Sequence, residues 1–143
     1  PDRFFRLQQH HFCMKGARID HVNLKIPVHR VEEAIDFYRD VLGFKAMKLE
    51  EFQNGERTSF FFRVSEEAVI NIRPKENFEE PSDRNFDHFC ITLEEKIDDI
   101  KKILEKNNIE ILREGSPLGS KGRGPGVYIR DPFGYMIELK AEK

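Results

Sequence analysis

The sequence has 143 residues, about one domain, and is long enough to bury a core without disulfide or metal staples. Charged residues make up 35% of the chain but nearly cancel, to a net charge of −2. This balance excludes bulk attraction to nucleic acid or to an anionic membrane surface. No apolar run reaches the roughly 20 residues of a transmembrane helix, and two cysteines form no disulfide framework. We therefore expect a cytoplasmic protein.

The chain contains two copies of one pattern. Ile19-Asp20-His21 recurs as Phe86-Asp87-His88, 67 positions later, from 21 to 88. At the same offset, residues 69–71 (VIN) fall on residues 136–138 (MIE). The register holds at both ends of the pattern, which indicates an internal duplication.

The duplication predicts one domain over 16–141, preceded by an N-terminal extension or cloning remnant over 1–15. The first module covers 16–74 and the second covers 85–141. The charged and polar segment 75–84 joins the two modules as a linker.

The first module is predicted to be a strand, a helix and three further strands. Its helix has an apolar stripe at 31, 35, 38 and 42 and stops at Gly43. Asn54-Gly55 predicts a tight hairpin turn. The expected elements are a strand over 21–26, a helix over 30–42, and strands over 44–52, 57–64 and 68–73.

The second module repeats this order. Thr92 and Glu95 are placed as a capping box for its helix, and Asp131-Pro132-Phe133-Gly134 predicts a type I turn. The expected elements after its first strand are a helix over 93–106 and strands over 109–113, 126–131 and 135–141.

Strand alternation assigns the side chains to faces. Val22, Leu24 and Ile26 should pack under the first helix, which leaves His21 on the opposite face. The same alternation places His88 and Glu138 on the face away from the helices. A curved sheet makes that face the wall of a cleft.

Two βαβββ modules with a histidine early in each and a glutamate in the closing strand resemble the vicinal oxygen chelate superfamily of glyoxalases, bleomycin-resistance proteins and extradiol dioxygenases. The segments IDHVNLKIP, FYRDVLGF and VYIRDPFGYMIEL are typical of it. The stretch GSKGRGPGVYIRDPFGYMIEL is most similar to the branch of glyoxalase-domain-containing protein 5. The resemblance implies an α+β fold with curved mixed sheets that form a metal cleft.

His21, His88 and Glu138 are the predicted metal ligands. Two imidazoles and one carboxylate form a facial triad that leaves coordination positions open for substrate. The set suits one divalent metal, with Mn, Fe, Co, Ni and Zn all compatible. Such a site supports an enzyme acting on a small oxygen-rich substrate, and a metal-free, bleomycin-resistance-like binding protein is the alternative.

The resemblance leaves the reaction open among a lyase, an extradiol-type dioxygenase and a fosfomycin-resistance-like transferase or hydrolase. A glyoxalase I is expected to carry a glutamate at the position of Asn71, and an amide has no useful basicity, so that activity is disfavoured. The extradiol signature matches from Val127 to Glu138 but lacks its upstream histidine, because Gly119-Ser120-Lys121 stands there.

Further candidates line the expected cleft. Tyr128 is predicted to be catalytic together with Glu138, because its phenol should turn toward the metal. Cys90 shares the face of His88, and basic residues suit an anionic substrate. The predicted substrate-binding residues are Asn23, Arg63, Asn71, Cys90, Lys121, Arg123 and Arg130. We expect a homodimer, and the sequence leaves open an intrachain site and a module-exchanged one in which one chain contributes His21 to the other's site.

Overall fold

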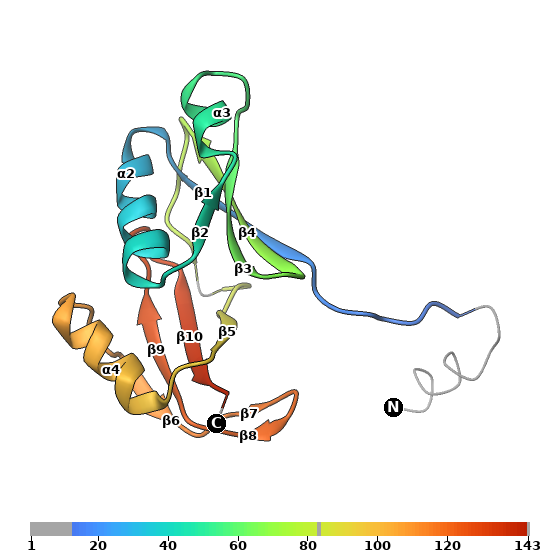
Figure 1. Ribbon diagram of the computed structural model, residues 1–143, viewed down its shortest axis with the longest axis vertical. Helices are drawn as coiled ribbons and strands as arrows, with labels where there is room; N and C mark the ends of the chain where they lie inside the picture. The colour runs from blue at the N-terminus through green and yellow to red at the C-terminus, as the bar shows by residue number, and fades with distance from the viewer. Residues whose placement is uncertain (1–12, 83, 143) are drawn as a thin grey trace.

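The computed structural model describes residues 13–82 and 84–142 (Figure 1). Most of the predicted N-terminal extension, residues 1–12, therefore lies outside the described residues. The chain has an α+β fold with two four-stranded mixed sheets and a separate two-stranded hairpin. None of the described helices is long and apolar enough to cross a membrane.

The first sheet has the strand order β1-β4-β3-β2, so β1 lies at its edge. In β1, Leu24 and Ile26 are buried while His21, Asn23 and Lys25 are exposed, as the alternation predicted. The strands are β1 (His21–Pro27), β2 (Lys45–Met47), β3 (Phe60–Ser65) and β4 (Ala68–Lys75).

The predicted helix over 30–42 is present but is not a regular α-helix. It begins with the short turn η1 (Val28–Arg30), continues as α2 (Val31–Ala34) and widens over η2 (Ile35–Val41). In this last part the Leu42 amide donates to the Phe37 carbonyl at 3.0 Å, five residues back rather than four. Gly43, at φ +81°, ends the helix as predicted.

The strand predicted over 44–52 is wrong after its first residues. β2 stops at Met47, because Lys48 adopts a left-handed conformation with φ 61°. The following segment forms the short helix α3 (Leu49–Gln53), and Leu49 and Phe52 pack on the core from one face of it. The Asn54-Gly55 pair ends this helix instead of joining two strands.

The second sheet has the order β5-β10-β9-β6, which repeats the first one. Its outer edge is β5, which pairs in parallel with β10. The elements are β5 (Phe89–Leu93), α4 (Ile97–Lys106), β6 (Arg113–Gly115), β9 (Gly126–Arg130) and β10 (Met136–Ala141). The turn predicted at Asp131 is present, with the Gly134 amide donating to the Asp131 carbonyl at 3.2 Å.

Two boundaries of the second module were predicted wrongly. The capping box of Thr92 and Glu95 does not form, because Thr92 extends β5 opposite Lys140 and α4 starts only after Lys96. The strand predicted over 109–113 begins at Arg113, since the preceding Ile109 and Ile111 pack on the core without pairing. The glycine-rich segment forms the hairpin β7 (Leu118–Gly119) and β8 (Gly122–Arg123).

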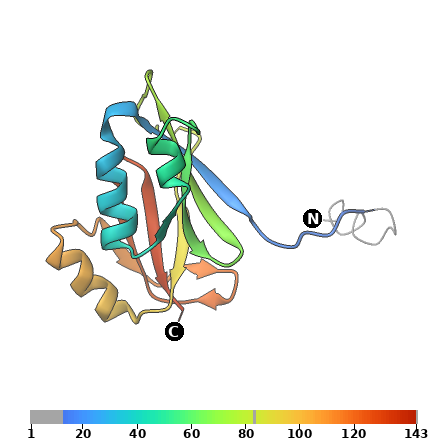
Figure 2. The ribbon, with the colours of Figure 1, turned by 45° about the horizontal axis from the view of Figure 1, so that its top comes forward.

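The two modules share one core. Figures 1 and 2 show α2 and α4 on the same side of the two sheets. Ala34 of α2 and Ile100 and Leu104 of α4 are buried in one cluster with apolar residues of both sheets. Tyr38 of the first module donates a hydrogen bond to the buried carboxylate of Asp131 in the second, at 2.7 Å. The other oxygen of Asp131 accepts from the amides of Phe133 and Tyr135, both at 2.9 Å.

Candidate functional site

The second module brings three candidate residues together. Glu138 lies on β10 opposite both Cys90 and Tyr128. Its Oε1 is 3.1 Å from Nε2 of His88, which directly precedes β5, and its Oε2 accepts a hydrogen bond from the Cys90 thiol at 3.4 Å. The residue is only 5% exposed, so its carboxylate is held away from bulk water. A carboxylate in such a place needs a cation or donors to compensate its lost hydration.

Tyr128 completes this group from the neighbouring strand. Its ring centroid lies 5.1 Å from that of His88, edge to face, and the residue is 8% exposed. Burial and then the Glu138 carboxylate raise the pKa of the phenol, while Arg113 acts in the opposite direction. The guanidinium carbon of Arg113 lies 4.1 Å above the tyrosine ring. The phenol therefore stays protonated and can donate a hydrogen bond toward the cleft.

Arg113 is a site residue that the sequence reasoning missed. The expected strand ended at 113, so no face was assigned to its side chain. In the structure Arg113 opens β6 and pairs directly opposite Tyr128. The sequence shows an arginine at this position, but only the register of β6 against β9 reveals that it lies opposite Tyr128.

Both predicted histidine ligands carry the same neighbour. Nδ1 of His21 lies 2.8 Å from Oδ2 of Asp20, and Nδ1 of His88 contacts Oδ1 of Asp87 in the same way. A carboxylate on Nδ1 fixes the ring orientation and leaves Nε2 with its lone pair for another partner. The repeated Asp-His pair is visible in the sequence, but the contact of each aspartate with its neighbouring ring is seen only in the structure.

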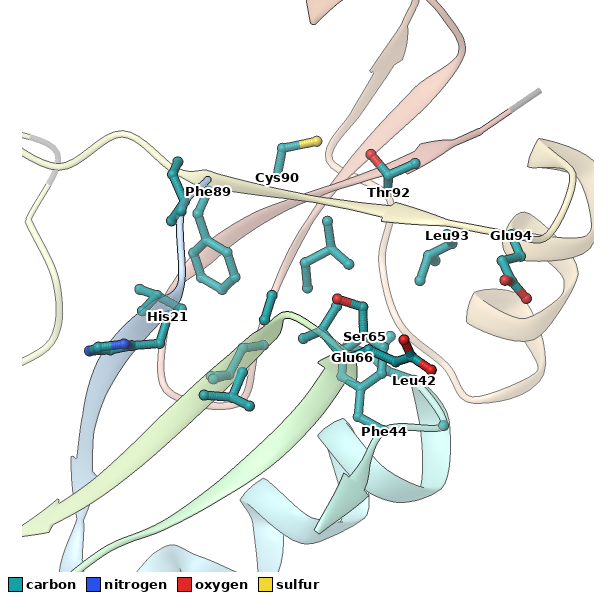
Figure 3. A pocket seen from close by; sticks show the side chains of 18 of the residues that line it. His21, Leu42, Phe44, Ser65, Glu66, Phe89, Cys90, Thr92, Leu93 and Glu94 are labelled. Atoms are coloured by element: carbon teal, nitrogen blue, oxygen red, sulfur yellow. The ribbon is translucent and has the colours of Figure 1, made fainter. Parts of the chain in front are cut away.

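His21 stands apart from His88 and Glu138 within the chain. It lines a cavity of about 1160 Å³ between the modules, together with His88 and Cys90. Figure 3 shows His21 on β1, with its ring pointing away from Cys90. Among residues 13–82 and 84–142, no three histidine, cysteine or acidic side chains gather closely enough to hold a metal. The structure thus assembles two of the three predicted ligands.

The first module carries amide and basic groups on the face of His21. Asn23 and Asn71 lie opposite each other on β1 and β4. The Asn23 side-chain oxygen accepts a hydrogen bond from Nε of Arg73 at 3.2 Å. Asn71 is therefore placed where the symmetric counterpart of Glu138 would stand, but it offers only an amide.

The predicted basic residues do not form one cluster. Arg63 donates to the Ser65 and Glu66 carbonyls of the β3–β4 turn. Arg123 donates to the Ser116 carbonyl at 3.2 Å, and Lys121 lies exposed at the tip of the hairpin β7–β8. Only Arg130 borders the same cavity as Tyr128.

Lys140 holds the hairpin β7–β8 against the second sheet. Its ammonium donates to the Pro117 and Gly122 carbonyls at 3.0 and 3.1 Å. A side chain on Gly119 would collide with it, since an added Cβ would lie 2.5 Å from Nζ. The Lys140 ammonium is thus engaged by carbonyl groups of this hairpin segment.

Cys90 is a weak nucleophile in this setting. Burial raises the pKa of its thiol, the charge of Glu138 adds to the effect, and the result is about 12. The thiolate is the reactive form, so this protonated thiol is not suited to act as a nucleophile.

The donor set fits a divalent metal. Two imidazoles and a buried carboxylate are ligands that transition metals accept from proteins, and Nε2 of His88 already lies 3.1 Å from the Glu138 carboxylate that would share the metal with it. The site could also place the Tyr128 phenol beside a substrate oxygen. Within the single chain, His21 does not approach His88 and Glu138.

The chain was compared with known proteins. It is 30% identical over 128 residues to virulence protein STM3117 of Salmonella typhimurium, covering 85% of this chain and 82% of that protein. It is 29% identical over 118 residues to a probable lactoylglutathione lyase of Synechocystis, covering 80% and 88%. The structure of a putative glyoxalase family protein from Bacillus anthracis superimposes with a TM-score of 0.69 at 30% identity, covering 91% and 100%.

The family profile of these proteins spans nearly the whole domain. It matches residues 18–139, from just before β1 into β10. The match includes both modules and every residue of the candidate site. The chain therefore belongs to the Glyoxalase/Bleomycin resistance protein/Dioxygenase superfamily.

Proposed function

We propose that the protein is a divalent-metal-dependent enzyme that acts on a small oxygen-rich molecule, with the metal held by His21, His88 and Glu138. The observation that carries the proposal is the repeated support of the two histidines. Asp20 and Asp87 hold Nδ1 of their neighbouring rings, which leaves Nε2 of each ring to meet a further partner, and for His88 this atom lies 3.1 Å from the proposed ligand Glu138.

The metal would supply Lewis-acid activation of a substrate oxygen. The protein residues around it have separate tasks. The buried Glu138 would provide the anionic ligand, and the protonated Tyr128 phenol would donate a hydrogen bond to a substrate oxygen or transfer a proton there. Burial of both residues keeps water away from the reacting group.

The same proposal places the complete site between two copies of the chain. His21 begins β1 and His88 directly precedes β5, and both strands are unpaired edges of their sheets. In a symmetric dimer with exchanged modules, β1 of one copy can lie beside β5 of the other. His21 of one chain would then complete the site that His88 and Glu138 begin in its partner.

The reaction class is narrowed by Asn71. Several relatives of the chain carry the name lactoylglutathione lyase, but an amide cannot act as the base that such chemistry uses. We therefore propose a different reaction, with a lyase of another substrate, a dioxygenase or a transferase as the candidates. Membership of the glyoxalase-domain-containing-protein-5-like branch stays a prediction.

Metal analysis of protein purified without chelator tests the proposal. Mn²⁺ titration should show one site per chain in the wild type and none in His88→Ala. His29→Ala is the matched control, because His29 is exposed on η1 and should leave the stoichiometry unchanged. A wild-type protein that takes up no divalent metal, and whose ligand binding survives His88→Ala, would instead be a metal-free binding protein.

A further inference from the structure

A second cavity, of about 370 Å³, borders Tyr128 on the second module. This volume is in the range of small-molecule sites. Its wall combines an apolar part with charged groups. The apolar side chains are Leu112, Phe86 and Met136, and the charged ones are Arg113, Arg130 and Asp87.

The two arginines approach the cavity from adjacent strands. Arg113 on β6 lies opposite Tyr128, and its guanidinium stacks on the tyrosine ring at 4.1 Å. Arg130 follows Tyr128 by two residues on β9, so both side chains leave the same face of the strand. The Arg130 guanidinium donates one hydrogen bond, to the Gly134 carbonyl at 3.0 Å.

Neither guanidinium is neutralised by an ion pair with a residue that the structure describes. Asp87 also lines the cavity, but its carboxylate is engaged with Nδ1 of His88. The two guanidinium groups and the single carboxylate of Asp87 leave the cavity with a local positive charge, which favours binding of an anion. A guanidinium has five donors in a planar fork, which matches the two oxygens of a carboxylate.

We propose that this cavity binds the carboxylate end of a small organic acid with an apolar or aromatic body, and that Arg113 and Arg130 select the acid over its neutral analogues. The inference deepens the proposed function and rests on it for the location of the reacting end. Tyr128 touches both the cavity and the His88 ring, so an acid anchored by Arg113 would extend toward Glu138.

Benzoate and its neutral isostere benzamide are the probes, each titrated into the full chain by calorimetry with and without Mn²⁺. Benzoate should bind at least about tenfold more tightly than benzamide, which corresponds to one lost charge-assisted hydrogen bond. Arg113→Gln and Arg130→Gln should each remove most of this preference and leave benzamide binding unchanged. Arg57→Gln is the matched control, because Arg57 is also exposed and donates to a backbone carbonyl, that of Ser59.

The results separate this inference from the proposed function. Equal affinity for the two probes, or a preference that survives both arginine variants, would overturn the acid site. Tight binding of phenylphosphonate with no binding of benzoate would also overturn it. Mn²⁺ stoichiometry in the same samples should be unchanged in Arg113→Gln. A wild type that discriminates benzoate but binds no Mn²⁺ would keep the acid site and refute the metal proposal.

Thermal unfolding of each variant checks that Arg113→Gln still folds, since the guanidinium also stacks on Tyr128. If it does not fold, the test uses Arg130→Gln and the ratio of the wild-type affinities for benzoate and benzamide. Arg113→Lys adds a further check, because it keeps the charge but loses the planar fork. It should retain only part of the preference for benzoate.

Discussion

The two modules repeat one fold but present different halves of the candidate site. In the second module, His88, Cys90, Tyr128 and Glu138 contact one another around a buried carboxylate. In the first, His21 is exposed and contacts its own neighbour Asp20. The duplicated backbone therefore fixed the positions, while the side chains diverged.

The divergence is clearest at the symmetric pair of Asn71 and Glu138. Both face the cleft from the strand next to the edge of their sheet, β4 in one module and β10 in the other. A carboxylate at one position and an amide at the other would give the proposed metal site one anionic ligand instead of two. The second module thus carries most of the expected affinity for metal, and the first adds one imidazole.

The largest expected effect contrasts these two positions directly. Glu138→Gln should weaken Mn²⁺ binding by more than about 100-fold, because it replaces an anionic ligand by a neutral amide rather than changing a supporting residue. Asn71→Ala should change the affinity by less than about threefold, since Asn71 is not a proposed ligand. Isothermal titration with Mn²⁺ measures both. Similar losses of Mn²⁺ affinity in the two variants would show that both modules contribute equally to metal binding and would contradict the proposed difference between them.

The next effect concerns the aspartates that hold the histidines. Asp20→Asn and Asp87→Asn should each weaken Mn²⁺ binding by about 10–100-fold, because the Nδ1 partner sets the orientation and basicity of the ring. The same titration applies. Asp40→Asn is a suitable control, as its carboxylate pairs with Arg39 on the surface. An unchanged affinity in Asp20→Asn alone would mean that His21 is not a ligand.

A smaller effect tests the junction between the modules. Tyr38→Phe removes the donor to the buried carboxylate of Asp131 and should lower the free energy of unfolding by about 1–3 kcal/mol. Tyr135→Phe is the matched control, because its hydroxyl donates to the Lys25 carbonyl in an exposed place. Urea denaturation should show the smaller loss for Tyr135→Phe. Equal losses would remove the special role of the buried contact.

The smallest effect is a pH dependence of that junction. Burial raises the pKa of Asp131 above its ordinary value of 3.8, and Tyr38 with the backbone amides opposes the rise. The folded state therefore binds the proton more tightly than the unfolded state. This contribution to stability is fully present below the ordinary pKa and is lost as the pH rises through the raised value.

Asp131→Asn cannot titrate and provides the reference. The free energy of unfolding of the wild type, measured relative to this variant in urea, should fall as the pH rises above the ordinary Asp131 pKa of 3.8. A difference that instead grows with pH would show that the hydrogen bonds to the carboxylate outweigh its burial. The Tyr38 contact would then stabilise the ionised form.

The sequence was sufficient for the fold class because the repeated Asp-His pair and strand alternation fixed the modules and their faces. The sequence was not sufficient to place individual elements where the fold overrode the local preference of a segment for strand or helix. Lys48 in a left-handed conformation turned a predicted strand into α3, and Thr92 extended β5 instead of capping α4. Both errors lie at element ends, where one backbone angle decides the outcome.

The site was predictable only in part for a related reason. His88, Tyr128 and Glu138 meet as alternation requires, because Glu138 and Tyr128 pair on adjacent strands and His88 directly precedes β5, on the other side of β10. The role of Arg113 depended on the register of β6, which sequence alone placed too early. The proposed meeting of His21 with His88 and Glu138 would depend on how two copies of the chain associate, which strand patterns do not encode.

Subunit complementation tests the central claim, a metal site shared between two copies. His21→Ala and His88→Ala chains should each bind no stoichiometric Mn²⁺ alone. After unfolding, mixing and refolding, a module-exchanged dimer should recover up to about a quarter of the wild-type sites, because half of the dimers are mixed and each has one intact site. No recovery, in a mixture that refolds and dimerises like the wild type, would contradict the shared site.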